Sequence, residues 1–227
     1  MQYEIRQRPN FSIAKVVFDT PGEQLVVEAA AMVAKDSSIQ MQTNMRGGLM
    51  GAAKRKLLGG ESLFQNTFTS TRPGETIWVA PAAEGDLLPF DMDGQRSVFM
   101  SSGNYVASGP GITLDTAFQG AKGFFSGTSL FMIEAKGQGP LILGSYGAIH
   151  PVKVGPQGYL VDNNHIVAFT QGLNYSIRKV GGLRSLFKGG EGLICEFKGE
   201  GTVWVATRSS SALAAFVHPF RTVQSKS

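Results

Sequence analysis

The chain has 227 residues, of which 42% are hydrophobic and 17% are charged, with a formal net charge of +4. This composition excludes a disordered chain, because the apolar content is enough to bury a core. The single cysteine, Cys195, excludes an intramolecular disulfide framework and a cysteine metal cluster. The N-terminal residues lack the apolar stretch of a secretory signal, and no apolar run reaches the length of a membrane span. We therefore expect a protein of a reducing compartment, the cytoplasm.

The residue types favour short strands joined by tight turns. Glycine accounts for 29 of the 227 residues, and β-branched and aromatic residues are frequent. In chain order, the first runs of strand type are residues 12–18 and 24–28, and each ends at a turn signal. These patterns predict an all-β fold.

Four landmarks recur three times in the same order. A turn signal comes first (residues 20–23, 93–95 and 155–158), and an apolar-Val-Ala tripeptide follows it (32–34, 105–107 and 166–168). A Gly-polar-small-Leu-apolar motif is third (60–64, 127–131 and 190–194), and an apolar strand is fourth (76–80, 140–144 and 202–206). Sequence self-similarity of this kind indicates repeated structural units that pack on one another.

The repeat predicts three tandem, pseudo-threefold-related units over residues 20–90, 91–154 and 155–208. Each unit is expected to be an antiparallel β-sandwich or a double-stranded β-helix-like unit, and the three together one compact body over residues 1–227. Glycine-bracketed inserts at 47–60, 120–127 and 181–190 are expected to form short helices or loops. In the tail, 209–227, we expect an apolar closing segment at 212–217 and a disordered end.

The inserts also contain the strongest candidate binding residues. Basic side chains are concentrated in and beside them and alternate with leucine and phenylalanine. Glycine-loop amides with cationic side chains can hold phosphate groups, and basic residues mixed with apolar ones suit an anionic membrane surface. The alternative is a solvated lobe that keeps the protein in solution. The candidate anion-binding or partner-binding residues are Arg46, Lys54, Arg55, Lys56, Lys122, Arg178, Lys179, Arg184 and Lys188.

Other residues with reactive side chains have structural interpretations. The three histidines share no metal-ligand spacing and are expected at the surface or in hydrogen bonds; they are His150, His165 and His218. Cys195 occupies an ordinary strand position, which predicts a buried and inert thiol. Residues 91–94 (DMDG) lack the further acidic ligands of a calcium loop and are expected to form a turn.

The two tryptophans have a structural interpretation, and known catalytic motifs are absent from the sequence. Trp78 and Trp204 align with Leu141 in the repeat, so we expect them to pack in the core. The sequence contains no phosphate-binding loop, no zinc-protease motif and no nucleophile elbow. We expect no catalytic residues, no cofactor and no metal, and hence no enzyme.

Five stretches then point to a family: EAAAMV (28–33), RGGLMG (46–51), GESLF (60–64), SYGAI (145–149) and GGEGL (189–193). With these the chain resembles, along nearly its whole length, the altered-inheritance-of-mitochondria (mitochondrial biogenesis) family in its bacterial form. The resemblance implies a fold like that of the trp RNA-binding attenuation protein, with three small antiparallel β-sandwiches in tandem. It carries over no catalytic residue, and the eukaryotic member is tied to organisation of the mitochondrial inner membrane.

These observations favour a non-enzymatic scaffold or interaction protein that self-associates and forms a homo-oligomer. Its inserts would contact a protein partner or an anionic membrane surface. The alternative, by analogy of fold, is an RNA-binding module that acts through the basic inserts, and its binding would weaken steeply with added salt.

Overall fold

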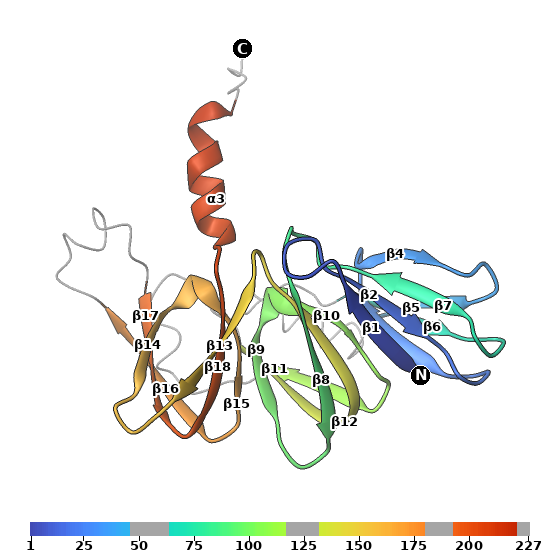
Figure 1. Ribbon diagram of the computed structural model, residues 1–227, viewed down its shortest axis with the longest axis horizontal. Helices are drawn as coiled ribbons and strands as arrows, with labels where there is room; N and C mark the ends of the chain where they lie inside the picture. The colour runs from blue at the N-terminus through green and yellow to red at the C-terminus, as the bar shows by residue number, and fades with distance from the viewer. Residues whose placement is uncertain (46–63, 117–131, 180–192, 222–227) are drawn as a thin grey trace.

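The computed structural model describes residues 1–45, 64–116, 132–179 and 193–221 (Figure 1). Within these ranges the chain is nearly all β, and its strands form several antiparallel sheets. The predicted fold class is thus confirmed. The three inserts that the sequence predicts as short helices or loops lie outside the described residues.

The described part of the first segment, residues 1–45 and 64–80, contains seven strands: β1 (Gln2–Arg6), β2 (Ile13–Val17), β3 (Gln24–Glu28), β4 (Met32–Lys35), β5 (Gln40–Met45), β6 (Phe64–Thr69) and β7 (Thr76–Val79). β7 lies between β2 and β4, and β6 lies between β3 and β5. β1 pairs with the other edge of β2. Buried and half-buried residues alternate along β2 and β7, as expected for strands with one face on a core.

The second segment, residues 87–144, has the same pairing order. Its elements are β8 (Leu87–Asp93), β9 (Val98–Ser101), the 3-10 helix η1 (Ser102–Asn104), β10 (Tyr105–Ser108), β11 (Ile112–Thr116) and β12 (Met132–Gly144). One long strand, β12, takes the place of the two central strands β6 and β7 of the first segment. The first half of β12 pairs with β9 and β11. Its second half pairs with β8 and β10.

The third segment, residues 149–206, repeats this order with separate strands. Its elements are β13 (Ile149–Val154), β14 (Tyr159–Asp162), the 3-10 helix η3 (Asn163–His165), β15 (Ile166–Thr170), β16 (Leu173–Lys179), β17 (Leu193–Gly199) and β18 (Gly201–Ala206). β18 lies between β13 and β15, and β17 lies between β14 and β16. The pseudo-threefold symmetry, the single compact body and the likeness to the trp RNA-binding attenuation protein stay predictions.

Neighbouring segments are joined by strand pairing. β10 pairs with β3, where Ala107 lies opposite Val27, and β15 pairs with β9, where Ala168 lies opposite Met100. A register shift just before each alanine marks a β-bulge against β12 or β18. A bulge bends a strand locally, which helps one strand to pair within its own segment and with the preceding segment.

The core consists of three clusters, and each contains side chains from two neighbouring segments. Phe169 of β15 is 1% exposed. Its ring stacks on that of Phe99 of β9 at a centroid distance of 5.0 Å, and the ring of Phe197 lies edge-on at 5.2 Å. All residues of β10 and nearly all of β15 are buried, because these strands are covered on both faces and paired on both edges.

The structure corrects the predicted alignment of the tryptophans by one residue. Trp78 and Trp204 lie opposite the alanine that follows the bulge, and in the second segment this position is held by Ile142, not by Leu141. Both tryptophans are half-buried, and Trp204 packs against the core of the second and third segments. The guanidinium of Arg6 lies 5.4 Å from the ring centroid of Trp78, a cation–π arrangement.

The tail also differs from the prediction. Residues 212–217 do not close the core; they lie in α3 (Ser210–Val217), which projects away from the sheets and is followed by the 3-10 helix η4 (His218–Phe220) (Figure 1). The hydroxyl of Ser209 caps α3 by accepting a hydrogen bond from the amide of Ala212 at 3.4 Å. Alanine has the highest helix propensity, which favours a helix here.

Glu75 connects the turn before β7 to the loop between β4 and β5. Its side chain is 3% exposed and accepts hydrogen bonds from the hydroxyl of Ser38, from the amide of Thr71 at 2.7 Å and from the hydroxyl of Thr71 at 2.8 Å. The hydrogen bond from Ser38 and, against the effect of burial, those from Thr71 lower the pKa of Glu75 from 4.5 to about 2.

Glu75 makes stability depend on acid pH. Below pH 4.5 the unfolded chain takes up a proton at this carboxylate that the folded chain does not. The contribution of Glu75 is therefore fully present above that pH and is lost as the pH falls to about 2. We expect Glu75→Gln to flatten the acid side of the stability profile, measured as the urea midpoint against pH. The exposed Glu84→Gln is the control, and the same acid loss in wild type and Glu75→Gln would contradict the assignment.

Phe169 should be one of the most sensitive core positions. Phe169→Ala leaves a cavity at the junction of the second and third segments, and truncation of a buried phenylalanine costs about 3–5 kcal/mol. We expect a loss of that size in the free energy of unfolding measured by chemical denaturation. Phe11→Ala is the matched control, because Phe11 is 66% exposed; its effect should stay within about 0.5 kcal/mol. Equal effects of the two substitutions would refute this account.

Candidate functional site

One edge of the molecule gathers the connections that lead into the junction strands. η1 precedes β10 and η3 precedes β15. The links from β7 to β8 and from β12 to β13, and the residues between β18 and α3, lie with them around two cavities. We call this surface the loop rim and define it as residues 81–84, 102–104, 145–147, 164–165 and 207–210.

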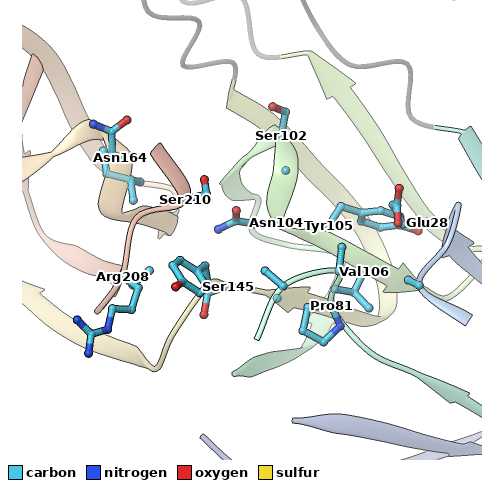
Figure 2. A pocket seen from close by; sticks show the side chains of 18 residues that line it. Glu28, Pro81, Ser102, Asn104, Tyr105, Val106, Ser145, Asn164, Arg208 and Ser210 are labelled. Atoms are coloured by element: carbon cyan, nitrogen blue, oxygen red, sulfur yellow. The ribbon is translucent and has the colours of Figure 1, made fainter. Parts of the chain in front are cut away.

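The first cavity of the loop rim has a volume of about 290 Å³. Figure 2 shows Asn104, Asn164 and Ser145 among the side chains around it, so hydroxyl and amide groups from the second and third segments meet here. Glu28 and Arg208 are the charged residues in its lining. The cavity can therefore take up a small polar group through hydrogen bonds.

The second cavity has a volume of about 620 Å³ and lies beside the first, since both are lined by Tyr146 and Arg208. Its wall is more apolar and includes Phe11 together with Leu213 and Phe216 of α3. The base of α3 is therefore part of the loop rim.

Hydrogen bonds to the main chain hold two of the rim's polar side chains. His165 Nδ1 lies 2.8 Å from the carbonyl oxygen of Ala206, and the hydroxyl of Ser145 donates to the carbonyl of Gly147 at 2.6 Å. His165 thus has the structural role that the sequence predicts. In the described part of the chain, no three His, Cys, Asp or Glu side chains gather to hold a metal ion.

An ion pair anchors the link from β7 to β8 beneath the rim. Asp86, 2% exposed, accepts hydrogen bonds from Arg8 Nε at 2.8 Å, from Arg8 Nη2 at 3.0 Å and from the hydroxyl of Ser12 at 3.0 Å. Burial acts to raise the pKa of Asp86, but these hydrogen bonds and that from the amide of Leu87 outweigh it and hold the pKa below its ordinary value. The link is thus fixed to the N-terminal loop.

Helix α3 presents the most exposed apolar side chains near the rim. Phe216 is 69% exposed and Phe220 of η4 is 76% exposed, with their ring centroids 5.9 Å apart. Leu213 and Val217 are 43% and 49% exposed. The sequence predicts this apolar run as a closing segment, whereas the structure leaves its large side chains exposed. Its uninterrupted apolar character next to serines was the signal that pointed to a helix.

The basic residues predicted as a binding site are not brought together by any described contact. Seven of them lie outside the described residues: Arg46, Lys54, Arg55, Lys56, Lys122, Arg184 and Lys188. Arg178 and Lys179 are the last residues of β16, where their backbones pair with β17. Binding through the inserts, to RNA or to another anion, therefore stays a prediction.

Two further predictions concern single residues. Cys195 is fully buried in β17, and burial, with the nearby charge of Asp162, raises the pKa of its thiol to about 11. The DMDG stretch ends β8 and turns at Gly94, whose φ is +83°, while Asp93 accepts a hydrogen bond from the amide of Gln95 at 2.8 Å. The burial of the thiol and the turn are confirmed, and the inertness of the thiol stays a prediction.

Comparisons with known proteins agree with the described fold. The family model described as mitochondrial biogenesis AIM24 matches residues 3–208. An uncharacterized protein of Streptococcus pyogenes serotype M6 is 24% identical over 213 residues, which cover 90% of this chain and 85% of that protein. A crystal structure of a Streptococcus pyogenes protein matches with a TM-score of 0.81 at 22% identity, covering 97% of this chain and 99% of that chain. At this identity the likeness shows a shared fold.

The state of Cys195 can be tested directly. Because its thiol is buried and its pKa is raised to about 11, we expect negligible reaction with a thiol reagent at mildly alkaline pH in the folded protein. Reaction should be complete in denaturant, where the thiol is exposed. Rapid labelling of the folded chain would show that the thiol is accessible.

Proposed function

Because the chain belongs to the mitochondrial biogenesis AIM24 family, we propose that it is a non-enzymatic interaction protein that binds an anionic membrane surface through α3. The observation that carries this proposal is the exposure of Phe216 and Phe220 at the end of a helix that projects from the sheets (Figure 1). A projecting helix can reach a flat surface before the sheets do.

The sequence of α3 supports a lipid surface as its target. Residues 210–217 contain no charged side chain, and Leu213, Phe216 and Val217 are exposed. Apolar side chains that enter the interfacial region of a bilayer contribute by burial of their area. Phenylalanine and leucine are typical of the buried face of interfacial helices.

The charges around α3 favour an anionic surface over a neutral one. Arg208 precedes the helix, Arg221 follows it, and residues 201–227 contain no aspartate or glutamate. Basic residues near an anionic leaflet contribute about 1 kcal/mol each, and salt screens this attraction. In the described ranges, no helix is long and apolar enough to span a bilayer. Binding from the cytoplasmic side is part of the proposal.

Flotation with lipid vesicles tests the proposal. We expect wild type to float with vesicles that contain an anionic phospholipid and to remain unbound with purely zwitterionic vesicles. The double substitution Phe216→Glu and Phe220→Glu removes two apolar groups that contribute about 1.5–3 kcal/mol each when buried. The apparent affinity should therefore fall at least about tenfold. Arg208→Gln with Arg221→Gln should weaken binding by a similar factor at low salt.

Met41→Glu is the matched control, because Met41 is 53% exposed and lies on β5, away from α3 (Figure 1). Its recovery with anionic vesicles should equal that of wild type. Two results would count against the proposal: no flotation with either vesicle type, or equal flotation with both.

A further inference from the structure

Three strands hold the same position in the three segments, but only two of them are paired on both edges. β4, β10 and β15 each pair with the last strand of their own segment, with a bulge just before an alanine. β10 and β15 also pair with the preceding segment, through β3 and β9. β4 is the outermost strand of its sheet within the described part of the chain.

The unpaired edge of β4 leaves apolar side chains exposed. Val33 is 56% exposed, whereas Val106 and Val167, at the same position of β10 and β15, are 3% and 0% exposed. Ala34, which follows Val33, is also exposed, while the corresponding Ala107 and Ala168 are fully buried. The valine and alanine that are buried at the junctions in β10 and β15 are thus also present in β4. Among the described residues, no strand pairs with this edge of β4 to bury them.

β14 is the complementary case, because it is an edge strand at the position where the other segments receive a junction strand. It occupies the position of β3 and β9, because it pairs with β17 as they pair with β6 and β12. β3 and β9 each receive a junction strand, but among the described residues β14 is the outermost strand of its sheet. Tyr159 and Leu160 are 44% and 57% exposed, whereas Leu25 and Val26 of β3 are 1% and 7% exposed.

The two unpaired edges lie at opposite ends of the molecule (Figure 1). One chain therefore cannot pair its own β4 with its own β14 in this structure. Each edge is one half of a contact that the chain makes twice internally, between β3 and β10 and between β9 and β15.

We infer that β14 of one copy pairs with β4 of a second copy and so forms a head-to-tail assembly. The internal junctions define the register: Ala107 lies opposite Val27 and Ala168 opposite Met100, which places Ala34 opposite Val161. Leu160 then lies opposite Lys35, whose aliphatic stem can cover it. A contact between two different edges adds copies until a ring closes, or without limit as a filament.

A second copy of this chain suits these edges better than an unrelated strand. An exposed edge pairs with any extended segment through its backbone, but side-chain packing selects the register. The outer edges of β5, β11 and β16, which also correspond to one another, have no paired counterpart among the described residues. Among the described edge strands, only β4 and β14 have counterparts whose partner is another segment of the same chain. This inference goes beyond the proposed membrane contact and does not depend on it.

Mixing of two single variants tests the contact. Val33→Glu damages the β4 edge and leaves β14 intact, and Leu160→Glu does the reverse. Both positions are more than half exposed, so the folded chain should tolerate a charge there. By light scattering after size exclusion, in buffer without lipid, we expect wild type to assemble and each variant alone to remain a monomer of 24.3 kDa. Their equimolar mixture should form a species of twice that mass and no larger.

The controls separate this contact from other modes of association. Phe216→Glu on α3 should assemble as wild type does, and the double variant Val33→Glu with Leu160→Glu should stay monomeric in every mixture. Circular dichroism and thermal melting verify that each variant is folded. Three results would overturn the proposal: wild type that is monomeric at all concentrations, assembly that neither single variant affects, and a mixture of the single variants that contains monomers alone. Membrane flotation has a separate outcome, so failure of either proposal is visible independently.

Discussion

Each segment of this chain is held to the next by a strand that pairs on both of its edges. β10 and β15 belong to their own sheets through β12 and β18 and to the preceding segment through β3 and β9. Strands in this position are covered on both faces, so most of their side chains are apolar, and the buried hydroxyl of Ser108 in β10 is hydrogen-bonded to that of Tyr105 at 3.0 Å. Each of the two strands has a small residue at the contact with the preceding segment. These residues are Ala107 and Ala168, which are fully buried.

The loop rim and α3 depend on this arrangement. η1 and η3 lie at the same edge because each leads into a junction strand, and their asparagines and serines therefore meet around one cavity (Figure 2). The link from β7 to β8 is fixed beneath them by Asp86 and Arg8. α3 starts where the last strand leaves this edge, so its apolar side chains project from the same surface. The cavities of the rim and the exposed side chains of α3 thus lie on one surface, which supports the proposed interaction role.

Local sequence patterns predicted individual strands well and their alignment less well. Residues 24–28 were predicted as a strand and form β3 (Gln24–Glu28), and the apolar-Val-Ala tripeptides mark β4, β10 and β15. The match of the tryptophans with Leu141 was wrong by one residue, because strand register depends on a bulge that only the partner strand reveals. The apolar tail was assigned to the core because hydrophobicity alone does not say whether a partner exists. The basic inserts lie outside the described residues, so no contact of theirs entered the candidate site.

The amino-acid sequence by itself determined the all-β class, the position of most turns and the membership of the AIM24 family. These properties depend on residue types that are close together along the chain. Only the tertiary structure decided which strands pair across the segments and which edges remain open. Val33, Val106 and Val167 stand in almost identical tripeptides, yet the first is exposed and the other two are buried. The physical reason is that burial is set by a neighbouring strand far away in the sequence, which β10 and β15 have among the described strands and β4 does not.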